Sequence, residues 1–285
     1  MPDGETCGWA GAGREDYRMT PRRVVLVTGG GSGIGAAVAR RAATEGWTVI
    51  ISGRRPEALA GVAEQALSIH GIPADVAEPD AVRRLVAETI RRFGRLDAVV
   101  ANAGTMVVGS AADTSLDQWN AALRINLTGA FILAREVIPH LRATRGSFVG
   151  IGSIAGLRAP REASAYAVSK AALGMLIQTI AVDEAQHGVR ANCVNPGWVR
   201  TEMADAEMAE FGASIGLSPE RAYAAVTALV PQGRPAEPEE VAGAVLWLIG
   251  ADSTYVNGAG ITVDGGTTIV DPGSVPFHFD VTRRA

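Results

Sequence analysis

The residues best suited to proton chemistry in this sequence are Tyr166 and Lys170, which lie four positions apart. On a helix this spacing puts both side chains on one face. A phenol has a reference pKa of about 10, which is too high for an efficient proton acceptor near neutral pH. Because a nearby ammonium favours the phenolate and lowers that pKa, the pair predicts a general acid and base for an alcohol oxygen.

Ser153 is a third candidate for the same site. It follows an apolar run from Ser147 to Gly152 that is typical of a buried strand, so its hydroxyl lies where a strand meets a loop. Site residues of parallel α/β sheets usually occupy that place. The alternative is that Tyr166 and Lys170 are ordinary surface residues of a helix. Their four-residue spacing, taken alone, favours this alternative. Other motifs are therefore needed to support a site.

A glycine-rich turn between a strand and a helix predicts a phosphate site. The β-branched run from Val24 to Thr28 leads into Gly29–Gly35, and Ala36 to Glu45 has helical character. Glycines let the backbone approach a pyrophosphate, and the helix N-terminus supplies free N–H groups and the positive end of a dipole. The spacing T-G-x-x-x-G-x-G differs from the G-x-G-x-x-G of other dinucleotide folds. Glycines alone would more simply indicate a flexible turn, but their position between a strand and a helix favours a phosphate site.

Strands and helices alternate along most of the chain. Further strands are predicted at Trp47–Ser52, Ile72–Val76, Leu96–Ala101, Ser147–Gly152, Val189–Val194 and Gly260–Val263. Helices are predicted at Pro56–Ile69 (with Leu67 on the apolar face), Pro79–Phe93, Leu116–Leu141 and Pro238–Ile249. This alternation predicts a parallel sheet covered by helices on both faces, with ligands at the carboxyl ends of the strands.

Asn126 lies in the apolar interior of the helix predicted from Leu116 to Leu141, and Gly129 three residues later predicts a local distortion. A core asparagine bonded to backbone and a catalytic residue are equally supported. Residues 202–235 predict two short helices around Ser218-Pro219-Glu220, and residues 198–234 are predicted to form a lid over the site.

Composition restricts the class of protein. A chain of 285 residues, 47% hydrophobic and 20% charged, fits one α/β domain. A net charge of −4 and a pI near 5.7 argue against nucleic acid. Two distant cysteines, Cys7 and Cys193, predict a cytoplasmic protein without a disulfide framework. No apolar run approaches the roughly 18 residues that suggest a membrane span, and the scattered histidines predict no metal site.

Seven motifs in this order resemble those of the classical short-chain dehydrogenases/reductases. They are Thr28–Gly35, Asn102–Gly104, Asn126, Ser153, Tyr166, Lys170 and Pro196–Thr201. The resemblance runs from about Val24 to Gly266 and implies a single-domain Rossmann-type α/β fold with a doubly wound, seven-stranded parallel sheet. It also implies a nicotinamide cofactor and a homotetramer or homodimer. Ala101-Asn102-Ala103-Gly104 departs slightly from the family, where many members have two asparagines.

The resemblance implies a role for each matching residue. Tyr166 would be general acid in carbonyl reduction and general base in alcohol oxidation, while Lys170 would lower its pKa and hold the nicotinamide ribose. Ser153 would donate a hydrogen bond to the substrate oxygen, and Asn126 would hold a water that links Lys170 to solvent. The implied cofactor residues are Thr28, Gly29, Ser32, Gly33, Ile34 and Gly35 at the pyrophosphate, Asp75 and Val76 at the adenine, Asn102, Ala103 and Gly104 at the adenosine ribose, and Pro196, Gly197, Val199 and Thr201 at the nicotinamide.

The function predicted in this way is hydride transfer between NAD(P)(H) and a small-molecule carbonyl or secondary alcohol. One alternative is a non-catalytic member of the fold that binds dinucleotide as a sensor or scaffold. Such proteins would be expected to lose Tyr166 or Lys170, and both are present. Epimerases and dehydratases of the extended branch are a second alternative, but they are typically longer and have a different glycine spacing.

The residues after the second strand favour NADP(H) over NAD(H). An acidic residue there would bind the ribose 2′-hydroxyl and repel a 2′-phosphate. Gly53 occupies that place and is followed by Arg54 and Arg55, whose guanidinium groups can pair with phosphate through parallel hydrogen bonds. Two solvated arginines at a helix start are the alternative, so NAD(H) stays open.

The sequence leaves the substrate open. The apolar residues of the lid, Met203, Met208, Phe211, Leu217 and Tyr223, predict either an apolar or mixed pocket or a lid that packs on itself. The region is weakly similar to that of acyl-carrier-protein and polyketide ketoreductases.

The two ends lie outside the domain expected over residues 21–270. Residues 1–20 are predicted to be disordered, and residues 1–18 to be an extension upstream of a native start at Met19. Phe277 and Phe279, in the tail 271–285, are predicted to pack on a neighbouring subunit, with a frayed end as the alternative.

Overall fold

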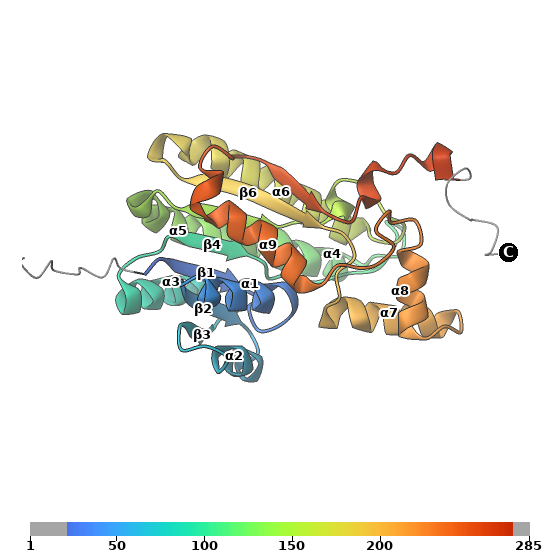
Figure 1. Ribbon diagram of the computed structural model, residues 1–285, viewed down its shortest axis with the longest axis horizontal. Helices are drawn as coiled ribbons and strands as arrows, with labels where there is room; N and C mark the ends of the chain where they lie inside the picture. Colours follow the sequence, from blue (N-terminus) through green and yellow to red (C-terminus); the bar gives the residue numbers. More distant parts are fainter. Residues whose placement is uncertain (1–21, 276–285) are drawn as a thin grey trace, which may run out of the picture.

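Seven parallel strands form the sheet at the centre of the protein, in the order β3-β2-β1-β4-β5-β6-β7. The structure is a computed structural model, and it describes residues 22–275 (Figure 1). The strands are β1 Val24–Thr28, β2 Thr48–Gly53, β3 Ile69–Pro73, β4 Ala98–Ala101, β5 Ser147–Ile151, β6 Arg190–Pro196 and β7 Gly260–Val263. Since β2 and β3 lie on one side of β1 and β4 to β7 on the other, strand order reverses between β1 and β4. In open α/β sheets ligands bind at such a reversal.

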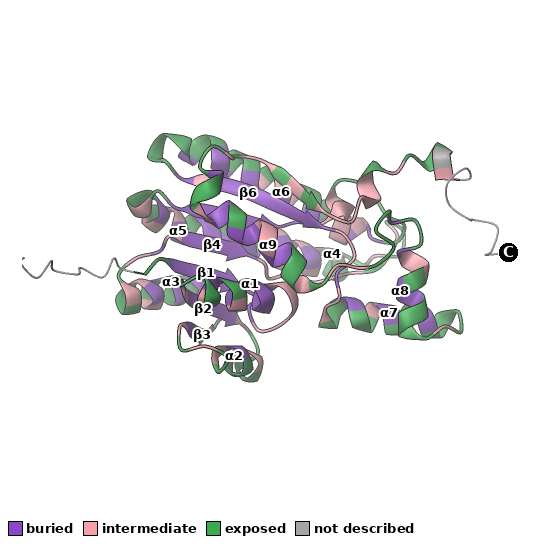
Figure 2. Cartoon of the chain, in the orientation of Figure 1, coloured by how far each residue is buried: buried purple, intermediate pink, exposed green. Residues whose placement is uncertain are grey.

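Helices cover both faces of the sheet. One face packs against α1 (Gly33–Thr44), α2 (Pro56–Ala63) and α9 (Pro238–Ile249). The other packs against α3 (Pro79–Phe93), α5 (Gly129–Thr144) and α6 (Ser164–Glu184), with α4 (Leu116–Leu123) beside α6. Alternate residues of β1 enter the two cores, as the period of a strand requires. Figure 2 shows the buried strands between helices whose outer faces are exposed.

Two helices stand apart from these layers. Helices α7 (Glu202–Ser214) and α8 (Pro219–Val226) project beyond the carboxyl ends of the strands (Figure 1). Their own small core contains Ala204, Met208, Ala222 and Tyr223. The two short helices predicted around Ser218-Pro219-Glu220 are therefore confirmed.

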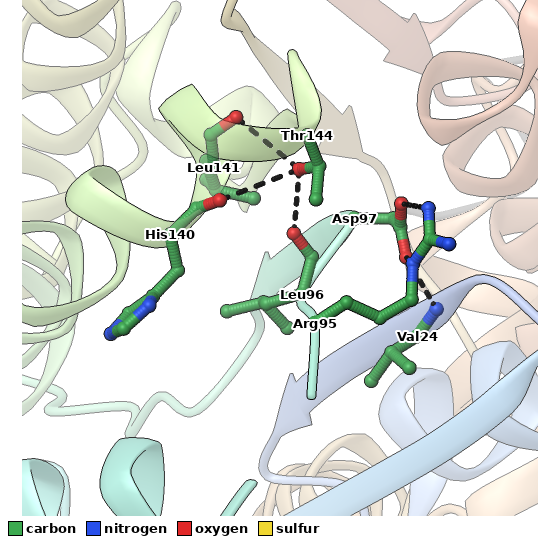
Figure 3. A network of polar contacts seen from close by, with 7 residues as sticks. All are labelled: Val24, Arg95, Leu96, Asp97, His140, Leu141 and Thr144. Carbon is green, nitrogen blue, oxygen red and sulfur yellow. Dashed lines mark hydrogen bonds and ion pairs between the residues drawn. The ribbon is translucent and has the colours of Figure 1, made fainter. Parts of the chain in front are cut away.

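The amino ends of the strands are held by a dense polar network (Figure 3). Asp97, just before β4, accepts from the backbone N–H of Val24 at 2.8 Å and from two guanidinium nitrogens of Arg95 at 2.8 and 2.6 Å. The hydroxyl of Thr144, at the end of α5, donates to the carbonyl of Leu96 at 2.7 Å. These bonds join β1, β4 and α5 at the edge of the sheet opposite the lid.

The predicted third strand is displaced. The strand predicted at Ile72–Val76 is in fact Ile69–Pro73, and the helix predicted to reach Ile69 ends at Ala63. Ile69 pairs with Val49 of β2, but it also continues the helical spacing from Val62, so periodicity alone could not separate the two elements. Leu67 lies in the connection and is fully exposed, which contradicts its predicted place on the apolar face.

Other boundaries differ less. Asn195 and Pro196, which lie beyond the strand predicted at Val189–Val194, belong to β6 and pair with Thr262 and Val263 of β7. The distortion predicted near Gly129 is confirmed, because Arg124–Thr128 forms a π-helical stretch between α4 and α5. A Cβ at Gly129 would lie 2.9 Å from Val76 Cγ2, so only glycine lets the helix approach this loop so closely.

One helical segment, Ser164–His187, is long and apolar enough to cross a membrane by length and composition, which contradicts the prediction that no apolar run approaches that length. Its inner residues Leu173, Ile177 and Ile180 pack in the core beneath the sheet, so its apolar character is that of a core helix. Among the described residues no group of three or more histidine, cysteine or acidic side chains could hold a metal ion. The predicted features of residues 1–20, Cys7, Phe277 and Phe279 lie outside the described residues.

Candidate active site

The structure brings the three proton-chemistry candidates together at the carboxyl edge of the sheet. Ser153 follows β5 and begins a short 3-10 turn, while Tyr166 and Lys170 lie in the first two turns of α6. The Nζ atom of Lys170 lies 5.7 Å from the centre of the Tyr166 ring. The predicted shared face of the helix is therefore present.

Tyr166 is partly exposed, and desolvation of its phenol raises the pKa of that group above the ordinary value. A hydrogen bond with Ser153 acts in the opposite direction and lowers that pKa, whereas the charge of Glu207 raises it. The net direction is opposite to the prediction from Lys170, because burial outweighs the stabilisation of the phenolate.

Lys170 is the only lysine in the chain, since all other basic side chains apart from histidine are arginines. Its side chain is 6% exposed, and its Nζ donates to the carbonyl of Ile151 at 2.8 Å. Burial lowers its pKa to about 8. A compact ammonium whose pKa responds to burial suits proton transfer near neutral pH, which an arginine cannot perform.

Asn126 uses its side chain to hold neighbouring elements in place. Its Nδ2 donates to the carbonyl of Thr105 at 3.0 Å and to Ser169 Oγ at 2.9 Å. Its Oδ1 accepts from the N–H of Thr105 at 2.8 Å. A Cβ on Gly104 would lie 3.2 Å from that oxygen and 3.4 Å from Lys170 Nζ. Asn126 thus fixes the loop after β4 against α6, next to Lys170.

The glycine-rich turn forms an open cradle between β1 and α1. Gly29 and Gly33 have φ values of 65° and 50°, which favour glycine. A Cβ on Gly35 would lie 2.3 Å from the carbonyl oxygen of Gly29. Ser32 precedes α1, and its side chain makes no capping hydrogen bond. The side chain of Ser32 thus leaves the first N–H groups of α1 uncapped, which is the geometry that an anion site at a helix start requires.

Thr28 and Asn102 brace this turn across the strand reversal. Asn102 Nδ2 donates to the carbonyls of Thr28 and Gly29 at 2.9 and 3.1 Å. Thr28 Oγ1 accepts from the N–H groups of Asn102 and Ala103 at 3.1 and 3.2 Å. These side chains therefore shape the cradle through protein contacts.

The arginines predicted to bind phosphate lie at the start of α2. Both Arg54 and Arg55 are exposed. Arg55 Nη2 lies 3.3 Å from Ser32 Oγ and 3.0 Å from Glu202 Oε2. Arg55 thus reaches the glycine turn and forms an exposed ion pair with the first residue of α7. Asp75, predicted at the adenine, accepts from the N–H of Ala77 at 2.9 Å.

The loop after β6 joins the sheet to α7. Thr201 caps α7 by accepting from the N–H of Ala204 at 3.2 Å, and a Cβ on Gly33 would lie 3.0 Å from Thr201 Cγ2. Val199 pairs with Ala236, and Gly197 packs against Asp264. The predicted cofactor residues thus come from loops that converge on one edge of the sheet, beside Tyr166.

Sequence reasoning missed two residues of this edge. The hydroxyl of Ser52, on β2, is the one buried side-chain polar atom of the described chain without a hydrogen-bond partner. Glu207, on α7, is half buried, and burial and Glu210 raise the pKa of its carboxyl. Ser52 could have been suspected as a polar residue next to Gly53. Glu207 gives no sequence signal, because it is one of several acidic residues in its helix.

The lid residues divide into two groups. Met208 and Tyr223 are buried and pack between α7 and α8, with Tyr223 donating to Asp205 Oδ1 at 2.7 Å. Met203 and Phe211 are 47% and 37% exposed. Leu217 is partly exposed. Two of the five apolar lid residues therefore pack the lid itself, and the apolar or mixed pocket stays a prediction.

Known proteins are similar to this chain in sequence and in fold. A family model described as enoyl-(acyl carrier protein) reductase matches residues 29–268. Meso-2,3-butanediol dehydrogenase of Serratia marcescens is 35% identical over 87% of this chain and 96% of its own. Glucose 1-dehydrogenase of Gluconobacter oxydans is 34% identical over 86% and 91%. A crystal structure of a variant actinorhodin polyketide ketoreductase with NADPH has a TM-score of 0.83 and 32% identity, over 86% of this chain and 97% of that chain.

The chain belongs to the short-chain dehydrogenases/reductases. It is an NAD(P)-dependent oxidoreductase of carbonyl and alcohol groups, as the sequence predicted. Each of the three relatives has the name of an oxidoreductase, so a non-catalytic sensor or scaffold finds no support there.

Proposed function

We propose that the protein catalyses reversible hydride transfer between NADP(H) and a small polar carbonyl compound, with Tyr166 as general acid and base. The observation that carries this proposal is the grouping of Ser153, Tyr166 and Lys170 beside an open glycine cradle. The nicotinamide cofactor supplies or accepts the hydride when it is bound.

The protein's own residues manage the proton. In reduction Tyr166 gives the phenol proton to the substrate oxygen, and in oxidation it takes that proton back. Ser153 donates a hydrogen bond that stabilises negative charge on the same oxygen. Lys170 supplies the nearby positive charge that favours the phenolate. The side chain of Asn126 is engaged by Thr105 and Ser169, so it holds the loop after β4 against α6; the water that would link Lys170 to solvent stays a prediction.

The cradle fits the pyrophosphate of a dinucleotide, because its glycines leave the backbone open and α1 presents free N–H groups. We assign cofactor contacts to the loops that converge there. They are Thr28, Gly29, Ser32, Gly33, Ile34, Gly35, Arg54, Arg55, Asp75, Val76, Asn102, Ala103, Gly104, Tyr166, Lys170, Pro196, Gly197, Val199 and Thr201.

The preference for NADP(H) rests on charge at the end of β2. No acidic residue follows that strand directly, and Arg55 extends toward Ser32 of the cradle. The ion pair of Arg55 with Glu202 is exposed on both sides, so it is weak and can give way to a phosphate. The ketoreductase relative was crystallised with NADPH, which agrees with this preference; NAD(H) is the alternative.

The substrate is proposed to carry a second hydroxyl or carbonyl group next to the reacting one. Glu207 places a half-buried carboxylate near Tyr166, and its charge affects the pKa of the phenol. A carboxylate there can accept a hydrogen bond from a neighbouring hydroxyl. The relatives named for a diol and a sugar have substrates of this kind. The segment 198–234 would act as the lid over such a substrate.

A homo-oligomer is proposed from the exposed apolar residues of α5 and α6. Phe131, Val168, Met175 and Val182 are between 46% and 78% exposed, and the last three recur every seven residues along α6. Burying such a stripe against a second copy would stabilise a dimer or tetramer. The free, buried Cys193 fits a reducing compartment, and we propose the cytoplasm.

A substrate screen tests the proposed function. NADPH or NADH is incubated with acetoin, 2,3-butanedione, an aldohexose lactone and a simple aliphatic ketone, and cofactor fluorescence is followed. We expect reduction of the vicinal oxygenated compounds with NADPH at the highest kcat/KM. Absence of turnover with every compound and both cofactors would contradict the proposal.

A further inference from the structure

One ion pair joins the lid helices to the arginines after β2. Arg55 Nη2 lies 3.0 Å from Glu202 Oε2 and 3.3 Å from Ser32 Oγ. Both charged side chains are largely exposed, at 63% and 65%. Within residues 22–275 this is the one ion pair between α7 or α8 and the rest of the protein. Arg55 thus connects the cofactor edge of the sheet to the start of the lid.

The backbone holds Glu202 beside the glycine cradle. Thr201, the residue before it, caps α7 by accepting from the N–H of Ala204 at 3.2 Å. A Cβ on Gly33 would lie 3.0 Å from Thr201 Cγ2, so α7 begins in contact with the cradle. The carboxylate of Glu202 therefore stays near Arg55 and the cradle even when its side chain rotates.

Glu202 contacts the guanidinium nitrogen that a phosphate needs most. A guanidinium binds phosphate best through two parallel N–H groups, and it can offer either Nη1 with Nη2 or Nε with Nη2. Both pairs include Nη2, which has two protons and already has two acceptors, Ser32 Oγ and Glu202 Oε2. Arg55 therefore cannot bind a phosphate in this way while it keeps both contacts.

Charge acts in the same direction. The 2′-phosphate of NADP(H) has a charge of about −1.5 to −2 near pH 7, and the carboxylate of Glu202 is a further negative charge at the same arginine. An exposed ion pair is weak, so a phosphate can displace Glu202 from Arg55. The displaced carboxylate remains nearby and repels the phosphate. Glu202 thus opposes the 2′-phosphate both as a competitor and as a like charge.

We propose that Glu202 is a specificity residue for the cofactor: its carboxylate competes with the ribose 2′-phosphate for Arg55 and so weakens the binding of NADP(H) relative to NAD(H). The inference rests on the proposed function, in which Arg55 contacts that phosphate. The cofactor preference of the wild type is then the balance between an arginine that favours the phosphate and a lid residue that opposes it. An acidic residue in the first turn also stabilises a helix, but that role does not involve Arg55 and would not distinguish the two cofactors.

Equilibrium binding measures the effect without turnover. Titration calorimetry compares NADP⁺ with NAD⁺ in the wild type and in Glu202→Gln, which removes the charge and keeps the size of the side chain. We expect the Kd for NADP⁺ to fall by about three- to tenfold and the Kd for NAD⁺ to stay unchanged. Adenosine 2′,5′-bisphosphate and adenosine 5′-monophosphate should show the same difference, because they differ only in the 2′-phosphate.

Two further variants show whether Glu202 acts through Arg55. Glu57→Gln is the matched control, because Glu57 is exposed, lies two positions after Arg55 and forms no ion pair with the described residues. It is expected to change neither Kd by more than about twofold. In the background of Arg55→Ala, Glu202→Gln should lose most of its effect on NADP⁺, since the competition is gone. The melting temperature of each variant checks that it is folded.

Crystal structures of the two complexes show the contact itself. With NAD⁺ bound, Arg55 is expected to keep its contact with Glu202, and with NADP⁺ bound to release it. The inference is overturned if NADP⁺ binds Glu202→Gln no more tightly than the wild type, or if Glu57→Gln gives an equal gain. It is also overturned if the gain is as large without Arg55, or if the contact survives in the NADP⁺ complex.

Failure of the proposed function looks different. Neither dinucleotide would then bind the wild type, and the inference would fall with it. If NADP⁺ binds the wild type and its Kd is insensitive to Glu202→Gln, only the role of Glu202 is overturned.

Discussion

The two edges of the sheet treat their polar groups in opposite ways. At the amino edge Asp97 accepts three hydrogen bonds from Val24 and Arg95 (Figure 3), and Glu184 takes two from Arg142 at 2.7 and 2.8 Å. At the carboxyl edge Ser52 has no partner for its hydroxyl, and Lys170 has one protein acceptor for three protons. The amino edge thus stabilises the fold, whereas the carboxyl edge keeps polar groups ready for other molecules.

The incompletely paired polar groups of the carboxyl edge lower the stability of the fold, and this loss can be measured. A buried ammonium is unfavourable unless it is fully hydrogen-bonded, and burial lowers the pKa of Lys170 accordingly. Changes at the carboxyl edge should therefore remove activity without lowering stability, and changes at the amino edge should do the reverse.

The largest effect is expected for Tyr166→Phe. The change removes the phenol hydroxyl and keeps the ring, so the side chain still fills its space. We expect kcat/KM for carbonyl reduction to fall by about 10²–10⁴-fold, with the melting temperature and NADPH binding unchanged. Stopped-flow cofactor fluorescence, calorimetry and a binding titration measure these quantities. Wild-type activity in this variant would exclude Tyr166 as the acid.

Lys170→Met tests whether the site costs stability. The folded-state pKa of about 8 lies below the ordinary 10.5, so between these pH values the unfolded chain binds more protons. Stability of the wild type should therefore rise with pH from about 8 to about 10.5. We expect the methionine variant to be inactive, to be more stable than the wild type at neutral pH, and to lose this advantage as pH rises.

Denaturant unfolding at several pH values measures this. Lys170→Arg is the contrast, because it keeps a buried charge that does not titrate. A methionine variant that is less stable than the wild type at neutral pH would show that Lys170 holds the fold together.

The amino edge provides the opposite case. Asp97→Ala leaves the N–H of Val24 and the guanidinium of Arg95 without their acceptor. Since hydrogen bonds to a charged group contribute about 1.5–3 kcal/mol, we expect a loss of about 2 kcal/mol in the free energy of unfolding. The value of kcat/KM should stay at the wild-type level. A large loss of activity with intact stability would remove the contrast between the edges.

The sequence allowed the sheet, its carboxyl-edge loops and the motif residues to be predicted, because these depend on local patterns. Val24–Thr28 is an uninterrupted β-branched run, and Pro79–Phe93 begins at a proline and ends before a left-handed glycine. The third strand was misplaced, since Ile69 fits both the helical and the strand pattern. An edge strand with alternating burial provides a weak signal.

The electrostatics of the site could not be predicted in the same way. The pKa of Tyr166 depends on how deeply α6 packs and on Glu207 from a helix about forty residues later. A cavity of about 80 Å³ lined by Lys170, Gly174 and Cys193 is formed by α6, β6 and the segment before β7, which meet only in the folded chain. Such properties arise from the tertiary contacts of distant segments.

The choice of cofactor tests the outermost part of the carboxyl edge. Arg55→Ala is expected to lower kcat/KM with NADPH by about tenfold, because a charge-assisted bond to phosphate is lost, and to leave NADH almost unaffected. Arg54→Ala should have a smaller effect, since the contact with Ser32 is made by Arg55. Steady-state kinetics with both cofactors measure this. A wild type that strongly prefers NADH would reverse the assignment.

The smallest effect is expected for Glu207→Gln. Its carboxylate raises the pKa of Tyr166, but it ranks behind burial and the bond with Ser153. Removing the charge should lower that pKa, so the rise of alcohol oxidation with pH should move to lower pH. If Glu207 also accepts a hydrogen bond from a neighbouring hydroxyl, KM for meso-2,3-butanediol should rise while KM for 2-butanol stays constant.

Glu210→Gln is the matched control, because Glu210 influences the pKa of Glu207 and is not among the causes that shift the pKa of Tyr166. Equal shifts in both variants would mean that the lid acts through its total charge. A shift confined to Glu207→Gln, together with the change in KM for the diol, would identify Glu207 as the residue through which the lid distinguishes a diol from a simple alcohol.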